Sequence, residues 1–336
     1  MEVLRDHSLK PYNSFGVDVW ASHYVKATNL SELREATQIP IAPKLVLGGG
    51  SNILFSKNYK GLVIHNAIPG MEVSAEFPDH VIVRVGAGVV WHELVKWSLS
   101  QNFGGLENLS LIPGTVGAAP IQNIGAYGVE FDQVFESLEA VELASGDVRS
   151  FDTEECAFGY RTSIFKHALK GKYAISHVSI RLSRSAHILN TSYGAIQSKL
   201  KEYQHDRITV QSVSRAVVEI RQSKLPDPKT LGNAGSFFKN PVLPQGLFAS
   251  LQKEYPDIPS YQALDNGIKI PAAWLIEKCG WKGFRQKDAG IYEKHALVLV
   301  NHGTAKGEEL YRLALAIQAS VQKIFQIELE PEVTLL

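Results

Sequence analysis

Residues 111–128, LIPGTVGAAPIQNIGAYG, decide the fold of this chain, because a run of this length without a charged side chain is unusual on a solvated surface. Its glycines allow consecutive backbone N–H groups to approach an anion without side chains in the way. We therefore expect the run to pack against something flat or phosphorylated. The alternative is a series of tight turns between strands.

Two shorter glycine runs precede it, LGGGSN at 47–52 and GAG at 86–88, and each follows an apolar strand pattern. None of the three runs has the third glycine of GxGxxG, and the chain contains no GxxxxGK[ST]. A Rossmann domain and a P-loop are therefore not supported. Three glycine-rich loops so close together favour a large phosphate-containing cofactor over three independent turns.

Strand and helix patterns alternate along the rest of the chain, which indicates a mixed α and β protein. Helices are expected at 89–102, at 272–280 and at 212–224, where a serine cap begins the helix. Segment 185–210 shows little periodicity, and the proline-rich segment 224–229, KLPDPK, marks a domain boundary. Further strands are expected at 61–66, 177–184 and 295–301, with a hairpin over 138–151 that turns at 145–147. A last helix should bury Leu310, Leu313, Ala314, Ile317, Val321, Ile324 and Phe325.

Composition excludes several classes of protein. The 336 residues carry 34 basic and 34 acidic side chains, so a net charge of zero and the lack of a basic tract argue against nucleic acid as a partner. Cys156 and Cys279 form no CxxC or Cys/His cluster, which argues against a metal site and a disulfide framework. No signal-peptide or membrane-span pattern occurs. We expect a cytoplasmic protein without metal, nucleic-acid or membrane partners.

Five ordered motifs together carry a family resemblance: LGGGSN (47–52), IPGTVGAAPIQNIGAYG (112–128), GYRTSIFK (159–166), GNAGSFFKNP (232–241) and LEPEV (329–333). In this combination the chain closely resembles the UDP-N-acetylenolpyruvoylglucosamine reductases, flavoenzymes that make UDP-N-acetylmuramate for bacterial peptidoglycan. The resemblance begins at NSFG (13–16) and covers nearly the whole chain.

The resemblance implies an α+β fold with a vanillyl-alcohol-oxidase-type (PCMH-type) FAD-binding domain of two α+β subdomains and a C-terminal α+β substrate domain. The first subdomain would span 1–66, with segment 327–336 returning near the active site. The second would span 67–224 and include a tyrosine loop near 185–210. The substrate-binding domain would span 225–326. A monomer is expected.

The implied reaction has two stages at one site. NADPH, the co-substrate, reduces a non-covalently bound FAD, and the enolpyruvyl nucleotide then accepts a hydride from flavin N5 on its methylene carbon. The family's stabilising arginine corresponds to Arg161, whose planar, permanently charged guanidinium suits a carboxylate that takes on enolate character. By itself, GYR would indicate a surface arginine in a turn.

Ser236 corresponds to the family's proton donor, and three interpretations compete from the residues alone. A nucleophile would favour GxSxG, whereas this stretch reads GSFF. A serine that follows glycine is most often a cap or turn residue. A general acid becomes reasonable where the acceptor is a carbanion-like centre and a lysine or water returns the proton.

Glu332 corresponds to the third functional position, and spacing alone does not separate it from Glu330. Near the substrate carboxylate it would be protonated or share a proton, because like charges repel. The short sequence after Glu332 leaves little to hold it in place.

The remaining implied contacts lie along the same motifs. Substrate contacts would come from Tyr193, Lys224, Asn240, Tyr261 and Lys282. FAD contacts would come from Gly48, Gly49, Gly50, Ser51, Asn52, Gly114, Thr115, Gly117, Gln122, Asn123, Gly125 and Ala126.

Two alternatives belong to other classes of protein. An oxidase of the same fold would attach its flavin through His or Cys, and neither residue occurs at 47–52 or 112–128. A nucleotide-sugar binding module without catalysis would not need Arg161, Ser236 and Glu332 together.

Overall fold

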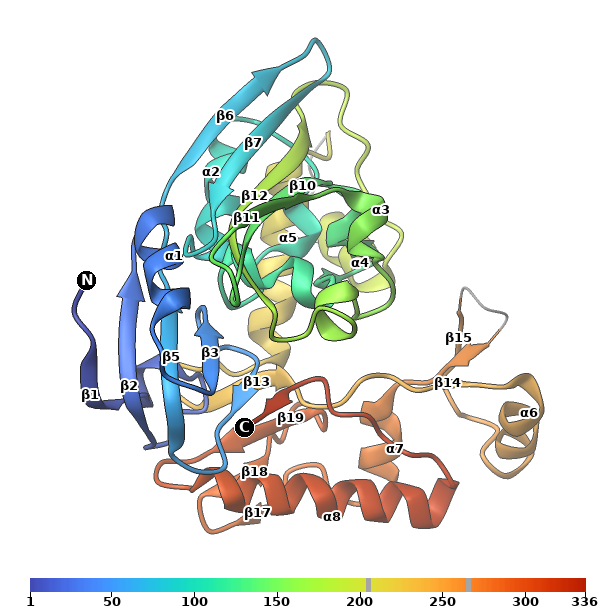
Figure 1. Ribbon diagram of the computed structural model, residues 1–336. Coiled ribbons are helices and arrows are strands. Elements are labelled where there is room, and N and C mark those ends of the chain that lie inside the picture. Colours follow the sequence, from blue (N-terminus) through green and yellow to red (C-terminus); the bar gives the residue numbers. More distant parts are fainter. Residues whose placement is uncertain (204–206, 264–266) are drawn as a thin grey trace. The chain divides into compact units, whose positions relative to one another are not determined.

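The computed structural model describes residues 1–203, 207–263 and 267–336 (Figure 1). The chain folds into two compact units that each mix helices and strands, as an α+β protein should. It passes between the units several times, the last time between Ser223 and Lys224. The three-part division at residues 66 and 224 stays a prediction. The first unit contains residues 1–7, 21–50 and 59–223, and the second contains 8–20, 51–58 and 224–336.

An antiparallel five-stranded sheet forms the centre of the first unit (Figure 1). The hairpin predicted over 138–151 is confirmed, because Leu138 pairs with Phe151 and Val141 pairs with Val148. The strands predicted before the second glycine run and at 177–184 are also present. In sheet order the strands are β11 (Val148–Phe151), β10 (Phe135–Glu142), β12 (Tyr173–Ser183), β7 (His80–Gly86) and β6 (Met71–Glu76).

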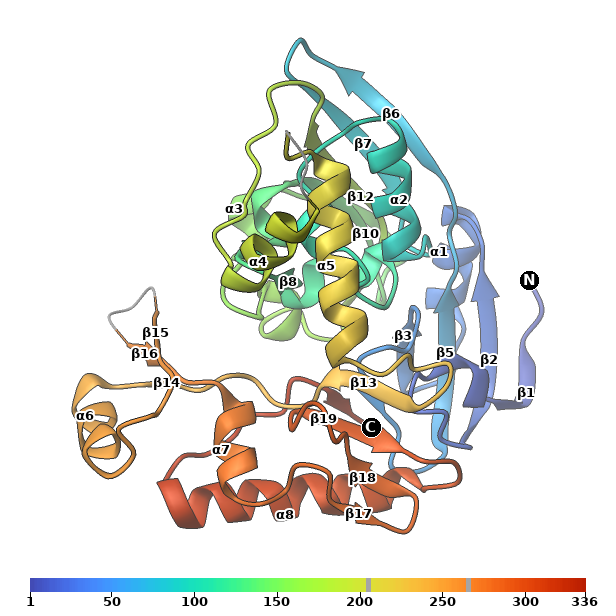
Figure 2. The same ribbon diagram turned by 180° about the vertical axis from the view of Figure 1, so that it is seen from behind.

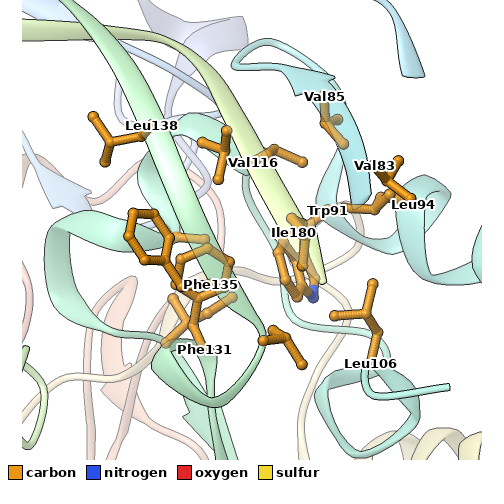
Figure 3. Close-up of a cluster of buried hydrophobic side chains, with 14 of the residues drawn as sticks. Val83, Val85, Trp91, Leu94, Leu106, Val116, Phe131, Phe135, Leu138 and Ile180 are labelled. Carbon is orange, nitrogen blue, oxygen red and sulfur yellow. The ribbon is translucent and has the colours of Figure 1, made fainter. Parts of the chain in front are cut away.

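The main core of this unit lies between that sheet and helix α2 (Trp91–Ser100), as Figure 3 shows. Trp91 is fully buried, donates from its indole Nε1 to the carbonyl of Leu109 at 2.9 Å, and meets Phe131 edge to face. Burying each large apolar side chain contributes about 1.5–3 kcal/mol. Val116, from the middle of the long glycine run, belongs to the same cluster. The core therefore anchors the run whose backbone we expect to meet a cofactor.

A second sheet of this unit is mostly parallel. Its cluster of buried side chains also includes Val141 and Ala174 from the five-stranded sheet, and Asn66 Nδ2 donates to the carbonyl of Ile175 at 2.6 Å. The two sheets therefore share one core around helix α1 (Leu30–Gln38), which Asn29 caps at Glu32 N. In sheet order the strands are β1 (Leu4–Ser8), β2 (Trp20–Ala27), β5 (Tyr59–Asn66) and β3 (Lys44–Leu47).

Helices α4 (Gly194–Glu202) and α5 (Val210–Lys224) differ from the sequence expectation. Part of the poorly periodic segment 185–210 is helical, and its residues 204–206 lie outside the described part of the chain. The serine predicted to cap α5 lies inside the helix, because Thr209 and Ser212 each bond the other's backbone N–H through their hydroxyls. Figure 2 shows α5 beside α2.

The second unit is built around a four-stranded sheet and the long helix α8 (Gly307–Phe325) (Figure 1). The predicted apolar face of α8 is buried except at Ile324, which is 46% exposed. Ile324 was therefore wrongly assigned to the core: at the last turn it is Phe325, 2% exposed and packed on Tyr255 and Trp274, that continues the buried face. The sheet runs β13 (Gly232–Ser236), β19 (Val298–Asn301), β18 (Ala289–Ile291) and β17 (Arg285–Gln286), and α7 (Ala272–Lys278) is the helix predicted at 272–280.

The remaining elements are short. In the first unit they are α3 (Thr153–Cys156), β8 (Gly125–Ala126) and β9 (Val129–Glu130). In the second unit they are β4 (Ile53–Leu54), β14 (Val242–Leu243), α6 (Gln245–Glu254), β15 (Tyr261–Gln262), β16 (Ile268–Lys269) and β20 (Thr334–Leu335). None of the helices in the described ranges combines the length and apolar character needed to cross a bilayer. Within those ranges, no group of three or more His, Cys, Asp or Glu side chains could hold a metal ion.

The reactivity of the Cys156 thiol reports whether reagents in solution can reach the core of the first unit. Burial among the core side chains raises the pKa of its thiol to about 12, so the nucleophilic thiolate is scarce at neutral pH. We expect a thiol reagent at about pH 8 to leave Cys156 unlabelled in the native protein and to label it after unfolding in urea. Peptide mass mapping gives the readout, with the partly exposed Cys279 as internal control. Fast native labelling of Cys156 would mean that this core opens readily.

Candidate active site

The three glycine runs come together in the first unit. A Cβ placed on Gly48 would lie 2.4 Å from Thr115 Oγ1, and one on Gly49 would lie 3.1 Å from the Cα of Gly114. The first and third runs therefore touch through backbone that has no room for side chains. A Cβ on Gly117 would lie 2.5 Å from the Cβ of Ala87, which brings the second run to the same place.

Backbone hydrogen bonds fix this arrangement. Trp91 N donates to Gly114 O at 3.0 Å, Val116 N donates to Val89 O and Gly117 N donates to Ala87 O, both at 2.9 Å. His92 holds the start of the long run, because its Nδ1 accepts from Leu111 N at 2.9 Å. Burial lowers the pKa of His92, which keeps the ring neutral and able to accept.

The donor set fits an anionic, phosphate-containing cofactor such as FAD. Converging backbone N–H groups bind phosphate oxygens without a counter-cation, provided that no side chain keeps the ligand away. The close approach of Gly48, Gly49 and Gly114 leaves such backbone uncovered by Cβ atoms. Within the described residues, neither Gly49 N nor Gly50 N donates a hydrogen bond to another backbone or side-chain atom.

Gly117→Ala gives a direct test of this cradle. The added methyl would collide with Ala87, and relieving such overpacking costs about 1–3 kcal/mol, so we expect FAD affinity to fall roughly tenfold or more. Flavin fluorescence titration measures the loss. The matched control is Gly246→Ala in α6, where a Cβ meets nothing within 4 Å. Unchanged FAD affinity in the Gly117 variant would show that these loops do not hold the cofactor.

The other predicted cofactor residues are distributed over both units. Run 47–52 crosses the division between them, since Gly50 belongs to the first unit and Ser51 and Asn52 to the second. Residues 122–126 stay in the first unit, where the buried Asn123 donates from Nδ2 to Gly159 O at 3.2 Å. This bond joins the long glycine run to the GYR motif. Gln122, Gly125 and Ala126 lie on the same run.

Arg161 lies in a crowded, polar setting in the first unit. Its backbone has a φ of 55°, in the left-handed region that non-glycine residues rarely adopt, and its side chain is 18% exposed. The guanidinium donates to the carbonyls of Asn123 and Gly125 and lies 3.6 Å from Glu130 Oε1. An unusual backbone held by several contacts is typical of a site where a side chain must be aimed.

Ser236 ends strand β13 in the second unit and is partly exposed. It pairs with Val298 of β19, and it follows Gly235, whose φ of 70° requires glycine. Asn233 Oδ1 accepts from Gly235 N at 2.9 Å and fixes this turn. The serine therefore lies at an irregular strand end directly after this turn, and it caps none of the described helices.

Glu332 lies beside this strand end. Its N–H donates to Phe237 O at 2.8 Å, while Lys239 N donates to Glu330 O at 2.9 Å, so the segments before and after Phe238 and Pro331 form an antiparallel pair. The two glutamates, which spacing does not distinguish, are separated here by their partners. Glu330 is 69% exposed and forms an ion pair with Lys239 at 2.5 Å. Glu332 is only partly exposed and adjoins the residue after Ser236.

The C-terminal segment is held firmly, contrary to the expectation that little sequence remains to fix Glu332. Asn52 Nδ2 donates to Glu332 O at 3.1 Å, and Thr334 N donates to Asn52 O at 3.0 Å. Both the backbone N and the Oγ of Ser56 donate to Leu336 O at 2.7 Å. β20 also pairs with β4 in parallel, so strand pairing with residues 52–56 holds this segment.

For two of the residues predicted to contact substrate, the structure shows specific neighbours. Tyr193 precedes α4 in the first unit, is 42% exposed, and packs edge to face on Tyr127 of the long glycine run at 5.1 Å. Asn240 in the second unit accepts from Ala272 N at 2.9 Å, so it holds the start of α7. The side-chain amide oxygen of Asn240 therefore has a structural role at the start of α7, in addition to the substrate contact predicted for this residue.

Three other residues lie in the second unit. Tyr261 is 55% exposed on β15. Lys224 and Lys282 are both exposed, and Lys282 pairs with Glu277 at 2.9 Å. Burial lowers the pKa of His295, and the positive charges of the two lysines lower it further. His295 therefore shares an electropositive neighbourhood that sequence reasoning missed, because no spacing pattern links these residues.

Together, the structure places Arg161, Tyr193 and the glycine cradle in the first unit, and Ser236, Glu332 and the lysines in the second. Glu130 is a further residue that sequence analysis missed. The only signal for it is its position directly after the glycine run, where the hairpin of β8 and β9 turns it toward Arg161.

Comparison with known proteins gives a consistent family assignment. The family profile described as "UDP-N-acetylenolpyruvoylglucosamine reductase, C-terminal domain" matches residues 227–336, and the profile "FAD binding domain" matches residues 21–152. The reductase of that name from Amoebophilus asiaticus is 48% identical over 100% of both chains. The one from Chromobacterium violaceum is 49% identical over 97% of both chains.

A solved structure agrees with the sequence relatives. The crystal structure of the Thermus caldophilus UDP-N-acetylenolpyruvylglucosamine reductase is 25% identical, has a TM-score of 0.68, and aligns over 99% of this chain and 98% of its own. The predicted fold class and the family resemblance are therefore confirmed. This chain is an oxidoreductase with an FAD-binding domain and belongs to the UDP-N-acetylenolpyruvoylglucosamine reductase family.

Proposed function

We propose that this protein reduces the enolpyruvyl group of UDP-N-acetylglucosamine enolpyruvate with NADPH to give UDP-N-acetylmuramate, for peptidoglycan precursor synthesis in the cytoplasm. Full-length relatives of that name, 48–49% identical to this chain, support the substrate class. The observation that carries the catalytic part is the pairing of Glu332 N with Phe237 O, which brings two proposed catalytic positions, Ser236 and Glu332, to adjoining backbone.

Bound FAD would supply two-electron chemistry, taking a hydride from NADPH and passing it to the methylene carbon of the second substrate. The chain's own groups have different tasks. Arg161 would stabilise the substrate carboxylate as negative charge spreads into it, and its contacts with Asn123, Gly125 and Glu130 would keep the guanidinium aimed. A preorganised cation stabilises the transition state more than a mobile one does, because it does not need to reorient during the reaction.

Ser236 would donate the proton that completes the reduction. An alcohol is a weak acid, but the carbon that it protonates is a much stronger base, so the transfer runs downhill. Glu332 would assist near the same carboxylate in a protonated or hydrogen-bonded form. Lys239 is three residues from Ser236, but its ammonium is engaged by Glu330, which supports water rather than Lys239 as the group that returns the proton to Ser236.

The electropositive group of Lys224, Lys282 and His295 would contact the nucleotide diphosphate, with Asn240 and Tyr261 in the same unit. Tyr193 would cover the diphosphate from the loop near 185–210. A folded monomer suffices for this scheme, because every proposed group comes from one chain.

Separate half-reactions test the proposal. Mixing the oxidised wild-type protein with NADPH without oxygen should bleach the flavin absorption, and subsequent addition of UDP-N-acetylglucosamine enolpyruvate should restore it. A colourless protein that gains no flavin absorption with FAD would contradict the cofactor assignment. Bleaching by NADPH without recovery on addition of the enolpyruvyl nucleotide would reject the substrate while leaving FAD binding intact.

A further inference from the structure

Glu332 lies where the C-terminal segment changes its pairing partner. On one side, Glu332 N donates to Phe237 O at 2.8 Å. On the other side, the chain bends at Val333, which is 3% exposed, and continues as β20, which pairs with β4. The place of the glutamate therefore depends on two supports, Phe237 before the bend and segment 52–56 after it.

Asn52 makes the first contacts on the β4 side. Its side-chain Nδ2 donates to Glu332 O at 3.1 Å, and its backbone O accepts from Thr334 N at 3.0 Å. These two bonds lie on either side of Val333, so a single residue holds both ends of the bend. The bond to Glu332 O comes from a side chain and needs an amide or similar donor, whereas the backbone pairing of β4 with β20 is open to almost any sequence.

Segment 52–56 gives these bonds a fixed support. Leu54 and Phe55 are 0% and 1% exposed. A Cβ placed on Gly307, at the start of α8, would overlap Phe55 O, so the helix packs directly on the backbone of the segment. Ser56 N donates to Leu336 O at 2.7 Å and closes the pairing at its far end. The bonds of Asn52 therefore tie Glu332 to the interior of the second unit.

The register of this pairing decides where Glu332 lies. Neighbouring residues of a strand are about 3.3 Å apart, so a slip of one residue would move the glutamate by about that distance. A misplacement of about 1 Å can slow a reaction by about 10²-fold when the reacting groups must be aligned. Because β20 contains only Thr334 and Leu335, few backbone bonds oppose such a slip. A side-chain bond that recognises one particular carbonyl therefore matters more here than in a long strand.

We propose that Asn52 is a positioning residue for Glu332, an inference that rests on the proposed function. Its side-chain amide fixes the register of β20 on β4 and keeps the glutamate beside Phe237, the residue after Ser236. Asn52 is also the last residue of glycine run 47–52, for which the family resemblance predicts a contact with FAD. The two roles are separable, because a cofactor contact acts on FAD affinity, whereas the placement of Glu332 acts on reoxidation.

Asn52→Asp tests this role, because aspartate has nearly the same size but replaces the donor by an oxygen that faces Glu332 O. At saturating FAD we expect NADPH to bleach the flavin at nearly the wild-type rate, and the enolpyruvyl nucleotide to reoxidise it about 10–100-fold more slowly. Stopped-flow absorbance measures both steps. The matched control is Asn58→Asp, which retains the Oδ1 that accepts from Trp20 N at 3.1 Å and should leave both steps unchanged.

A second pair of variants leaves the glycine run intact. Thr334→Pro removes the N–H that donates to Asn52 O, whereas Thr334→Ala keeps it and changes only an exposed side chain. We expect proline to slow reoxidation by about tenfold or more without a change in FAD affinity, and alanine to change neither. Normal reoxidation in the proline variant would overturn the proposal. Weaker FAD binding by Asn52→Asp with normal reoxidation at saturating FAD would do the same.

Hydrogen exchange of the C-terminal peptide gives a readout that needs no substrate. The amides of Thr334 and Leu336 donate to Asn52 O and Leu54 O, both at 3.0 Å. In FAD-loaded protein they should exchange at least about tenfold faster in Asn52→Asp than in the wild type or in Asn58→Asp, because the strand opens more often. Mass spectrometry of the peptide measures this difference. Equal exchange in the three proteins would show that the side chain does not hold the strand, and would reject the inference.

The outcomes also distinguish this inference from the proposed function. A wild type that the enolpyruvyl nucleotide reoxidises, together with an Asn52→Asp protein that it reoxidises equally fast, would overturn this inference alone. A wild type that NADPH bleaches and the nucleotide does not reoxidise would overturn both. If Asn52→Asp does not fold, the comparison of Thr334→Pro with Thr334→Ala decides the question.

Discussion

Ser236→Ala should leave NADPH-driven bleaching of the flavin at nearly the wild-type rate and slow its reoxidation by the enolpyruvyl substrate by about 10²–10⁴-fold. The first half-reaction needs no proton from the protein at the substrate carbon, whereas the second is completed by that proton. Alanine removes only the hydroxyl, and the turn made by Gly235 and Asn233 does not depend on it. Stopped-flow absorbance of the flavin measures both half-reactions.

The variant Ser236→Cys provides the control. A thiol is a better acid than an alcohol, so it should recover part of the lost rate if proton donation is the role of this position. A substrate dissociation constant that rises while the reoxidation rate holds would indicate a binding contact instead. Equal loss in both half-reactions would point to damage of the fold or of FAD binding, and the proton-donor assignment would then be wrong.

Glu332→Gln is expected to have the second large effect, again confined to reoxidation and about 10²–10⁴-fold in size. Glutamine keeps the size of the side chain and the backbone bond from Glu332 N to Phe237 O, but it cannot hold an exchangeable acidic proton. The loss should therefore appear in the rate constant rather than in substrate binding. Single-turnover kinetics at saturating substrate give the measurement.

Glu330→Gln is the matched control, because it makes the same chemical change two residues away. Glu330 is 69% exposed, and ion pairs with an exposed partner contribute about 0–1 kcal/mol, so activity should change by less than about fivefold. A result in which the Glu330 variant loses reoxidation and the Glu332 variant keeps it would reverse the assignment.

For the glycine runs, the sequence predicts the kind of site and the structure shows how the runs are brought together. Their glycines, lack of charge and strand-flanked positions predict an anion cradle, because those properties are local. The contacts of Gly48 with Thr115 and of Gly117 with Ala87 join positions far apart in the chain, and no local pattern encodes them. The family resemblance predicts the cofactor class, whereas the shape of the cradle comes only from packing.

Local sequence reasoning fails where tertiary contacts override it. Helix α4 has weak periodicity because only Ile196 is fully buried, so its amphipathic pattern is too faint to recognise. Ile324 follows the apolar period of α8 but is 46% exposed, because the contacts with Tyr255 and Trp274 at this turn are made by Phe325. Glu330 and Glu332 have the same spacing pattern and differ only in the partners that folding provides.

By itself, the sequence determined the α+β class, the glycine runs and the family to which the chain belongs, since these depend on composition, periodicity and ordered motifs. Only the tertiary structure decided that Glu332 rather than Glu330 adjoins Phe237, the residue after Ser236, and that strand pairing with residues 52–56 holds the C-terminal segment. The physical reason is that hydrogen-bond pairing and burial depend on residues that lie far apart in the sequence and meet only in the folded chain. A local sequence pattern therefore does not predict them.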